Sequence, residues 1–248
     1  MLRRLRRFAV PTDLPTDLTI SPVCRVVRNR VEGQWVQFCV VDPADTIQRE
    51  HLKGQFYEPE ELAIIRRYMP RDAVFCDIGA NIGNHTLYVL KYLDVKRSIL
   101  FEPNPDAISL LTTNIAVNGI KDRCDLSNLG FGLGDQDAAG FDFDTPDRNL
   151  GGTRLVDDGG AIEVRRGDDL LGDQPIDFIK LDVEGMELKV LDGLKRVIAR
   201  NRPTLFIEVD KENADTFQTW VKANDYEIRE RFQRYEENEN FLLTCKRS

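Results

Sequence analysis

From Asp72 to Ala223 the sequence alternates short apolar runs with stretches of helical periodicity, and this pattern limits the fold more than any other feature. The apolar runs predict five strands: Val74–Ile78, Ser98–Phe101, 124–132, Ile176–Leu181 and Thr204–Val209. Helical stretches are predicted at Gly83–Leu93, Asn104–Gly119, Gly185–Arg200 and Asn213–Ala223. Such alternation implies a mainly parallel sheet with helices on both faces.

Two later predicted strands, Glu227–Phe232 and Phe241–Cys245, face each other across an acidic loop. They predict an antiparallel strand at one edge and bring the sheet to seven strands. Residues 133–170 are too Gly-rich and too long for a simple crossover. We predict that they form an insertion of short strands before the fourth strand, above the sheet edge where ligands bind in such folds.

The N-terminal part of the chain has a different pattern. Residues 1–22 are rich in Pro and Asp and predict a loose arm, whereas Cys24–Val41 alternates apolar and polar residues around a central Glu-Gly turn and predicts a β-hairpin. The polar stretch 42–61 predicts a loop. Pro59, near the end of this stretch, begins a predicted helix that ends at Pro70. We therefore divide the chain into an arm and hairpin, 1–50, and one α/β domain, 51–248.

The charge of the chain argues against a nucleic-acid partner. The formal net charge is -8, which repels a phosphate backbone. The basic run from Arg3 to Arg7 is interpreted as a frayed tail, with weak contact to an anionic membrane surface as the alternative. No apolar run reaches the length of a signal-peptide core or of a transmembrane helix.

The cysteines and histidines limit the kind of metal site. Five widely spaced cysteines without a Cys-x-x-Cys pair are typical of a protein in a reducing cytoplasm. Only two histidines, His51 and His85, exclude a His-rich zinc site. We predict no metal site, with an oxygen-ligand site for magnesium or calcium at Asp182, Glu184 and another acid as the rival interpretation.

The turn from Asp77 to Gly83, in the run FCDIGANIGNHTL, departs from the fingerprint of dinucleotide-binding proteins. Asn81 stands where a pyrophosphate needs close backbone approach, and Asp77 at the end of the strand would repel a diphosphate. Glu102, at the end of the next strand, can accept hydrogen bonds from ribose hydroxyls. An acidic pocket with a ribose site fits S-adenosylmethionine, which carries sulfonium and ammonium charges.

The motifs DIGANIGNHTL, FEPNP, IKLDVEGMELKVLDG and LFIEV together resemble the FkbM family of S-adenosylmethionine-dependent methyltransferases. GQFYEPEEL and NLGGTRL are similar to that family too, and the resemblance extends from about Gln48 to Asp210. It implies a Rossmann-like class I methyltransferase fold and methyl transfer to an oxygen. It also implies an acceptor hydroxyl on a sugar, a glycan or a natural product.

The resemblance also implies roles for individual residues. The predicted S-adenosylmethionine-binding residues are Asp77, Gly79, Asn81, Gly83, Glu102, Asp135 and Asp182, with Tyr57 as a wall of the site. Glu102 is assigned to the ribose and Asp135 to the adenine edge. The general base that takes the proton from the acceptor hydroxyl is predicted to be Asp182, then His85, then Glu184.

Three alternatives remain open at the level of sequence. The first is a nicotinamide-dependent oxidoreductase on a Rossmann-like fold. The second is a non-catalytic partner protein that keeps the methyltransferase fold. The third is a methyltransferase whose acceptor is a protein or a nucleic acid, which the acidic charge balance disfavours. No sequence feature indicates an oligomeric state.

Overall fold

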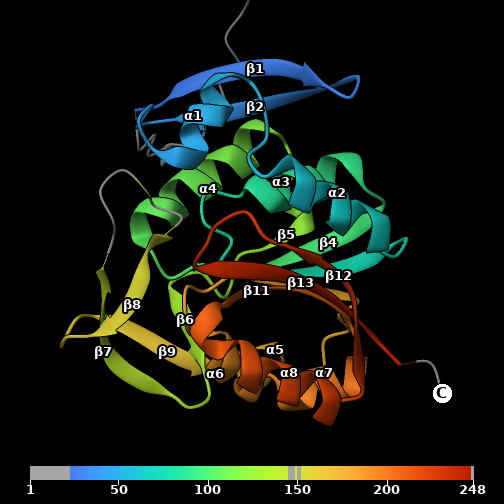
Figure 1. Cartoon of the computed structure of the whole chain (residues 1–248). Helices are drawn as coiled ribbons and strands as arrows, with labels where there is room; N and C mark the ends of the chain where they lie inside the picture. The colour runs from blue at the N-terminus through green and yellow to red at the C-terminus, as the bar shows by residue number, and fades with distance from the viewer. Residues whose placement is uncertain (1–22, 145–148, 150–151, 247–248) are drawn as a thin grey trace, which may run out of the picture.

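A seven-stranded sheet forms the centre of the part of the chain that this computed structural model describes, residues 23–144, 149 and 152–246 (Figure 1). In spatial order the strands are β12 (Tyr226–Phe232), β13 (Asn238–Cys245), β11 (Thr204–Asp210), β10 (Phe178–Leu181), β3 (Ala73–Ile78), β4 (Val95–Phe101) and β5 (Cys124–Asp125). β13 is antiparallel to both of its neighbours, and the other neighbouring pairs are parallel. The predicted mainly parallel seven-stranded sheet is confirmed, with the antiparallel strand one place in from the edge.

Helices cover both faces of this sheet (Figure 1). On one face lie α2 (Pro59–Tyr68), α3 (Asn84–Tyr92) and α4 (Pro105–Val117), and on the other lie α5 (Gly167–Leu171), α6 (Glu187–Gly193), α7 (Lys195–Asn201) and α8 (Ala214–Ala223). All six residues of β3 are buried. Val74 and Cys76 belong to one hydrophobic cluster and Phe75 to the other. Successive side chains of a strand face opposite layers, so a strand buried on both faces is a continuous apolar run.

The N-terminal hairpin is confirmed, and the polar segment after it contains an unpredicted helix. β1 (Arg25–Val31) and β2 (Gln34–Val40) pair antiparallel around a two-residue turn. α1 (Thr46–Leu52) begins after Asp45, whose side chain accepts hydrogen bonds from the first-turn N–H groups. The ring of His51 on α1 stacks on the ring of Phe38 of β2, with the ring centroids 4.4 Å apart. Packing against the hairpin therefore stabilises a helix here, and the prediction of a loop was wrong. The predicted division at residue 50 falls inside α1 and stays a prediction.

Two predicted elements are broken in the structure. The predicted strand 124–132 ends after Asp125, and the chain turns before β6 (Phe131–Gly134), which belongs to another sheet. The predicted helix Gly185–Arg200 is divided into α6 and α7 at Leu194. A Cβ atom on Gly193 would lie 1.9 Å from the carbonyl oxygen of Gly134. The close approach of β6 to the end of α6 thus depends on a glycine inside a helical pattern.

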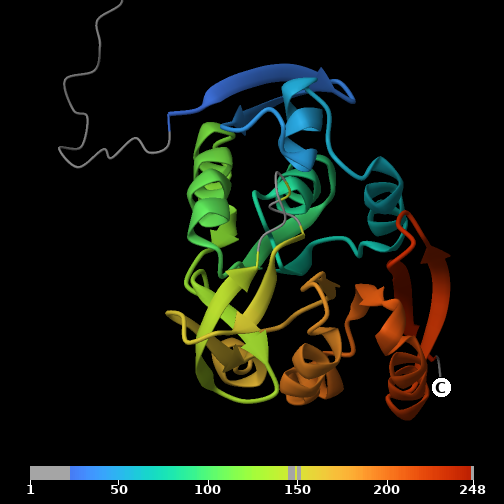
Figure 2. The ribbon, with the colours of Figure 1, turned by 60° about the vertical axis from the view of Figure 1, so that its left-hand side comes forward.

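The predicted insertion is confirmed as a second sheet of four strands. Its spatial order is β6, β9 (Ile162–Arg166), β7 (Ala138–Asp144) and β8 (Arg154–Asp157). Figures 1 and 2 show this sheet beside the end of the central sheet. Side chains from β7 and β8 line a cavity together with the carboxyl ends of β3, β4 and β10. The insertion therefore lies over the predicted edge of the sheet.

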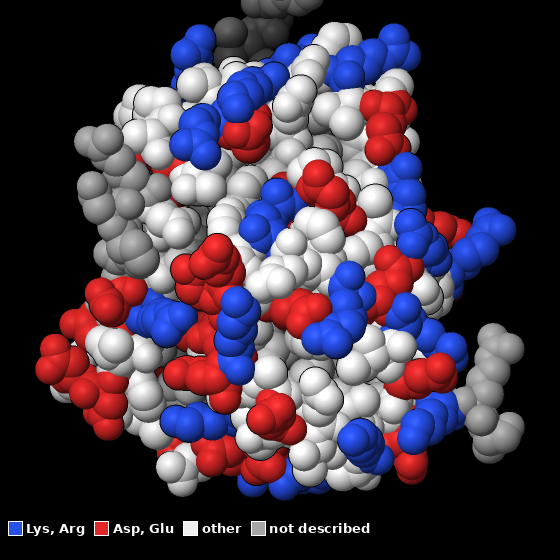
Figure 3. Space-filling view, viewed as in Figure 1, with Lys and Arg blue, Asp and Glu red and all other residues white. Residues whose placement is uncertain are grey.

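Charge is distributed unevenly over the surface (Figure 3). Lys and Arg side chains gather over the hairpin, where β1 carries Arg25, Arg28 and Arg30, and Asp and Glu gather over the insertion. No helix within the described ranges has the length and apolar character needed to cross a membrane. The basic run Arg3 to Arg7 and residues 150–151 of the NLGGTRL motif lie outside the described residues.

Candidate functional site

Two adjoining cavities open at the carboxyl ends of the central strands. The first, named here the Glu102 cavity, has a volume of about 70 Å³, and the second, the acidic cavity, has a volume of about 390 Å³. The acidic cavity is within the range of roughly 300–1,000 Å³ found for small-molecule sites, whereas the Glu102 cavity is a narrower cleft beside it. The two cavities share four residues: Gly79, Asn81, Asp182 and Glu184. Groups bound in the two cavities would meet at this shared boundary.

The turn between β3 and α3 forms part of that boundary. Gly79 has φ +76°, and a Cβ atom there would lie 1.8 Å from the carbonyl oxygen of Asp182. The N–H groups of Gly79 and Ala80 donate to the carbonyl oxygen of Phe101 at 3.0 and 2.9 Å. Only glycine allows the backbone of the turn to lie this close to the end of β10. The ends of β3, β4 and β10 are thus held together through the backbone.

Glu102 lies in the first cavity, directly after β4. Glu102 is 7% exposed. Its Oε2 atom accepts a hydrogen bond from the backbone N–H of Asn81 at 2.7 Å, and its Oε1 atom accepts one from the backbone N–H of Asn104 at 2.9 Å. Burial raises the pKa of Glu102 to about 7, although the two N–H donors favour the charged form. Each oxygen keeps a lone pair for a further donor, so this carboxylate can accept hydrogen bonds from a vicinal diol.

The remaining wall of the Glu102 cavity is mainly apolar. It includes side chains from the insertion and from the segment before α6: Phe131, Leu133, Phe143, Leu155, Val183 and Met186. A flat aromatic ring fits such a wall, because apolar burial is favourable and non-directional. The lining of this cavity therefore matches a ligand with a diol at one end and an aromatic group at the other.

Three residues predicted to bind a cofactor line neither cavity. Asp77 is 0% exposed; its Oδ2 accepts the hydroxyl of Thr86 at 2.6 Å. Gly83 has φ +89° and begins α3, where a Cβ atom would lie 2.6 Å from Leu111 Cδ1. These two residues support the turn from behind it. Asp135 is exposed beyond the end of β6, whereas Leu133, two residues earlier, faces the cavity. Contact of these three residues with a cofactor stays a prediction.

The acidic cavity gathers carboxyl groups from strand ends that are distant in sequence. Carboxyl oxygens of Asp182, Glu184 and Glu208 lie within 4.8 Å of one another. Burial, followed by repulsion from Asp182, raises the pKa of Glu184 to about 8 and that of Glu208 to about 10. Such perturbed groups in a cavity are typical of a functional site.

Lys180 lies at the base of the acidic cavity. Its Nζ atom is 3.4 Å from Asp182 Oδ2 and 3.5 Å from Asp77 Oδ1, and it donates to the carbonyl oxygen of Gly79 at 2.7 Å. Burial alone would lower the pKa of Lys180, but the carboxylates of Asp182 and Asp77 raise it above its usual value. A buried ammonium group thus links the turn after β3 to the acid after β10.

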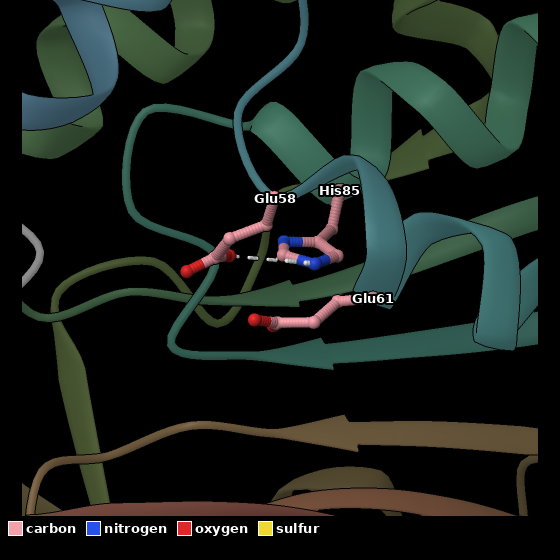
Figure 4. Close-up of side chains that lie close together, drawn as sticks. All are labelled: Glu58, Glu61 and His85. Atoms are coloured by element: carbon pink, nitrogen blue, oxygen red, sulfur yellow. Dashed lines mark ion pairs between the residues drawn. The ribbon is translucent and has the colours of Figure 1, made fainter. Parts of the chain in front are cut away.

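His85 enters the acidic cavity from the start of α3 and lies beside Glu58 and Glu61 (Figure 4). Its Nε2 atom is 3.9 Å from Glu58 Oε2. Burial, together with nearby Lys180, holds the pKa of His85 well below its usual value. Burial and neighbouring Glu61 raise the pKa of Glu58, and burial raises that of Glu61 to about 7. The imidazole is therefore neutral at neutral pH.

Tyr57 lies in the acidic cavity and not in the Glu102 cavity, where it was expected as a wall of the cofactor site. Its hydroxyl is 2.5 Å from that of Tyr235, in the segment between β12 and β13. Its backbone N–H donates to Asn84 Oδ1 at 3.0 Å, and its carbonyl oxygen accepts from Asn84 Nδ2 at 2.9 Å. Tyr57 is thus fixed to α3 beside His85.

Sequence reasoning left several residues of the acidic cavity out of the predicted site: Glu58, Arg154, Lys180, Glu208, Tyr235 and Asn238. Lys180 had a usable signal, because it is an ionisable residue within the otherwise apolar β10. Glu208 had a weaker signal, because β11 also carries Asp210. Glu58 precedes Pro59 with φ 58°, and nothing in its local sequence indicates that it faces His85.

Comparison with known proteins gives a consistent result. Residues 77–238, more than half of the chain, match the family model of the methyltransferase FkbM domain. The hexuronic acid methyltransferase AglP of Haloferax volcanii is 28% identical over 174 residues, which cover 68% of this chain and 68% of AglP. The methyltransferase sdnD of Sordaria araneosa is 28% identical over 164 residues, 51% of this chain and 62% of sdnD.

Solved structures confirm the fold. The crystal structure of methyltransferase FkbM from Methylobacillus flagellatus KT superposes with a TM-score of 0.55 at 21% identity, covering 82% of this chain and 56% of that one. The tRNA methyltransferase TrmK of B. subtilis superposes with a TM-score of 0.51 at 12% identity, covering 77% of this chain and 68% of that one. The chain therefore has the Rossmann-like methyltransferase fold, and it spans little more than half of the FkbM structure.

Proposed function

The chain belongs to the FkbM family of methyltransferases, and from this premise we propose that it transfers a methyl group from S-adenosylmethionine to a hydroxyl group of a sugar, glycan or natural product. The observation that carries this proposal is the pair of adjoining cavities that share Gly79, Asn81, Asp182 and Glu184. Methyl transfer requires a donor and an acceptor whose reacting atoms are brought into contact and alignment. Two cavities with a common boundary suit that requirement.

The Glu102 cavity is the proposed donor site. The carboxylate of Glu102 suits ribose hydroxyls, and the wall around Leu133 and Met186 suits adenine. Asp182 at the shared boundary suits the positive charges of the donor, whereas it would repel a diphosphate. Bound S-adenosylmethionine supplies a methyl group that its sulfonium already activates. The residues present therefore fit this donor better than a nicotinamide dinucleotide.

The acidic cavity is the proposed acceptor site. Its lining offers several polar side chains that hydrogen-bond to hydroxyl groups: Tyr57, Asn84, Asn149, Tyr235 and Asn238. AglP, a relative by sequence, is named for methylation of a hexuronic acid. Together these points support a sugar hydroxyl as the acceptor, with a natural-product hydroxyl as the second class.

Asp182 is the proposed general base. It lines both cavities, and its side chain is 31% exposed beside Lys180. A sugar alcohol is a weak nucleophile, so its proton must leave as the new bond to carbon forms. The Asp182 carboxylate takes that proton, and Lys180 holds the carboxylate in place. His85 and Glu184 are the next candidates, and both line the acidic cavity.

The decisive experiment has two steps. Titration calorimetry of the purified chain with S-adenosylmethionine is expected to show binding. Incubation with this donor and a panel of sugars, uronic acids and glycans is then expected to add about 14 mass units to one class, one methylene per transferred methyl. Absence of donor binding contradicts the proposal and favours a non-catalytic partner protein. A cytoplasmic location is also proposed, supported by five free cysteines.

A further inference from the structure

Glu58, Glu61 and His85 form a compact group that the proposed methyl transfer does not explain. Their ligand-type atoms all lie within 4.8 Å of one another. Glu58 and Glu61 come from the start of α2, and His85 comes from the first turn of α3 (Figure 4). The three side chains therefore meet only because the chain before α2 packs against α3.

His85 gives an independent indication of a ligand. Its side chain is 7% exposed, and its buried Nε2 atom has no hydrogen-bond partner among the described residues. Buried polar atoms in native proteins are almost always paired, and an unpaired one requires an explanation. This nitrogen points to the same space as the carboxyl groups of Glu58 and Glu61, as Figure 4 shows.

We propose that Glu58, Glu61 and His85 bind a divalent transition-metal cation at the wall of the acidic cavity. The cation would fill the space between the unpaired imidazole nitrogen and the two carboxyl groups. Glu58 and His85 line the cavity, so the remaining coordination positions face it. This site was not predicted from the sequence, which brought neither glutamate near His85.

The ligand set selects the class of cation. One imidazole nitrogen with two carboxylate oxygens is suited to manganese, iron, cobalt or zinc. Magnesium and calcium prefer ligand sets made entirely of oxygen. The other acidic group, Asp182 with Glu184 and Glu208, has only oxygen ligands. We therefore expect the group with His85 to prefer a transition-metal cation and the group with only oxygen ligands to prefer magnesium or calcium.

The surrounding charges allow a divalent cation in this position. Lys180 and Arg234 are the nearby positive groups that affect Glu58, and Asp182 is a nearby negative group. Arg234 Nε donates to Glu61 Oε1 at 3.2 Å, and its Nη2 donates to Glu60 Oε2 at 2.8 Å. The second oxygen of Glu61 remains available as a ligand. Binding of the cation would displace the protons that burial favours on Glu58 and Glu61.

A bound cation would also act on the acceptor. This role rests on the proposed function, whereas binding of the cation itself does not. A hydroxyl group that coordinates a divalent cation has a lower pKa and loses its proton more readily. The cation would then assist Asp182 in removing the proton of the acceptor hydroxyl. Donor binding takes place in the Glu102 cavity and does not require the cation.

Manganese titration calorimetry of the chain, without donor or acceptor, tests the site. We expect one binding event per chain, tighter for manganese than for magnesium, with release of protons from the carboxyl groups. Glu61→Gln and His85→Gln are expected to weaken manganese binding by about 10-fold or more. The matched control is Glu60→Gln, because Glu60 is the exposed neighbour that also pairs with Arg234; it is expected to leave affinity unchanged.

Several outcomes would overturn the site. No manganese, cobalt or zinc binding to the wild-type chain rejects it, as does a Glu61→Gln variant with unchanged affinity. Loss of binding in Glu184→Gln, with binding retained in Glu61→Gln, would assign the cation to the other acidic group. Visible absorption of bound cobalt, expected to change in His85→Gln, tests the nitrogen ligand directly. S-adenosylmethionine binding by the same samples separates failure of this site from failure of the proposed function.

Discussion

The Glu102 cavity and the acidic cavity lie side by side but are built in different ways. The Glu102 cavity is shaped by backbone: the turn at Gly79, the hydrogen bonds to Phe101 and the two N–H groups that hold Glu102. The acidic cavity is shaped by ionisable side chains from four separate segments: Glu58, His85, Lys180, Asp182, Glu184 and Glu208. One cavity depends on close approach of strands and the other on charge.

This difference indicates a division of work between the cavities. A site held by backbone hydrogen bonds keeps one shape and suits a ligand that is the same in every reaction cycle. A site of crowded carboxyl groups holds perturbed pKa values, as at Glu184 and Glu208, and suits proton transfer or cation binding. Mutations in the first should therefore change structure and donor affinity, and mutations in the second should change turnover and pH dependence.

The largest effect is expected from Gly79→Ala. The new Cβ atom would clash with the carbonyl oxygen of Asp182 at 1.8 Å in a backbone of φ +76°. We expect the free energy of unfolding to fall by about 3 kcal/mol or more, with loss of donor binding, measured by thermal unfolding and calorimetry. The control is Gly119→Ala, where φ is +65° and nothing lies within 4 Å; strain alone should cost about 1 kcal/mol. Equal losses in both variants would contradict a sterically closed turn.

Asp182→Asn tests the boundary between the cavities. Removing the proposed base, while Lys180 remains 3.4 Å from the position of Oδ2, is expected to lower kcat by about 100-fold or more. Donor affinity should fall far less than kcat, because the side chain keeps its size and the rest of the Glu102 cavity is unchanged. Steady-state kinetics with a parallel donor titration measure both quantities. An equal loss of turnover and donor affinity would assign Asp182 to binding instead of proton transfer.

Glu208 predicts how stability depends on pH. Burial and neighbouring carboxyl groups raise its pKa from 4.5 to about 10 in the folded chain, so between these values the folded state holds a proton that the unfolded chain has released. The free energy of unfolding should therefore fall as pH rises, by about 2 kcal/mol from about pH 6 to about pH 8. Glu208→Gln should flatten this slope in denaturant titrations, because its amide cannot ionise and its oxygen still accepts from Asn238.

A matched variant checks the pH prediction. Glu212→Gln changes an exposed glutamate in the same C-terminal part of the chain and is expected to leave the pH slope unchanged. If Glu208→Gln also leaves the slope unchanged, protonation of Glu208 does not contribute to the pH dependence of the free energy of unfolding. If stability rises with pH in the wild-type chain, the sign of the effect is wrong.

The smallest effect is expected from Glu102→Gln. The amide keeps one acceptor oxygen for the N–H of Asn81 or Asn104 but loses charge and part of its capacity for ribose hydroxyls. We expect donor affinity to fall by about 10-fold, or roughly 1.4 kcal/mol, with little change in kcat at saturating donor. Asp135→Asn, at an exposed residue that lines neither cavity, is expected to keep wild-type affinity. A reversed result would restore Asp135 as a donor contact and remove Glu102.

Much of the Glu102 cavity was predictable from sequence, because its parts follow local rules. The apolar run of β3, the glycines after it and the capped start of α4 at Asn104 act between near neighbours in the chain. They predicted the seven strands, the turn at Gly79 and the position of Glu102. Gly132 and Leu133 of β6 line the cavity, whereas Asp135 follows the end of β6 and is exposed, so its contact with the adenine edge stays a prediction.

The acidic cavity, by contrast, was decided by tertiary structure. Glu58 and His85 are brought together by packing of the loop before α2 on α3, and Lys180 and Glu208 by the pairing of β10 with β11. The sequence by itself determined the order of strands and helices, since hydrophobic periodicity and turn chemistry are local properties. Which charges face each other depends on contacts between distant segments, and no local pattern contains that information.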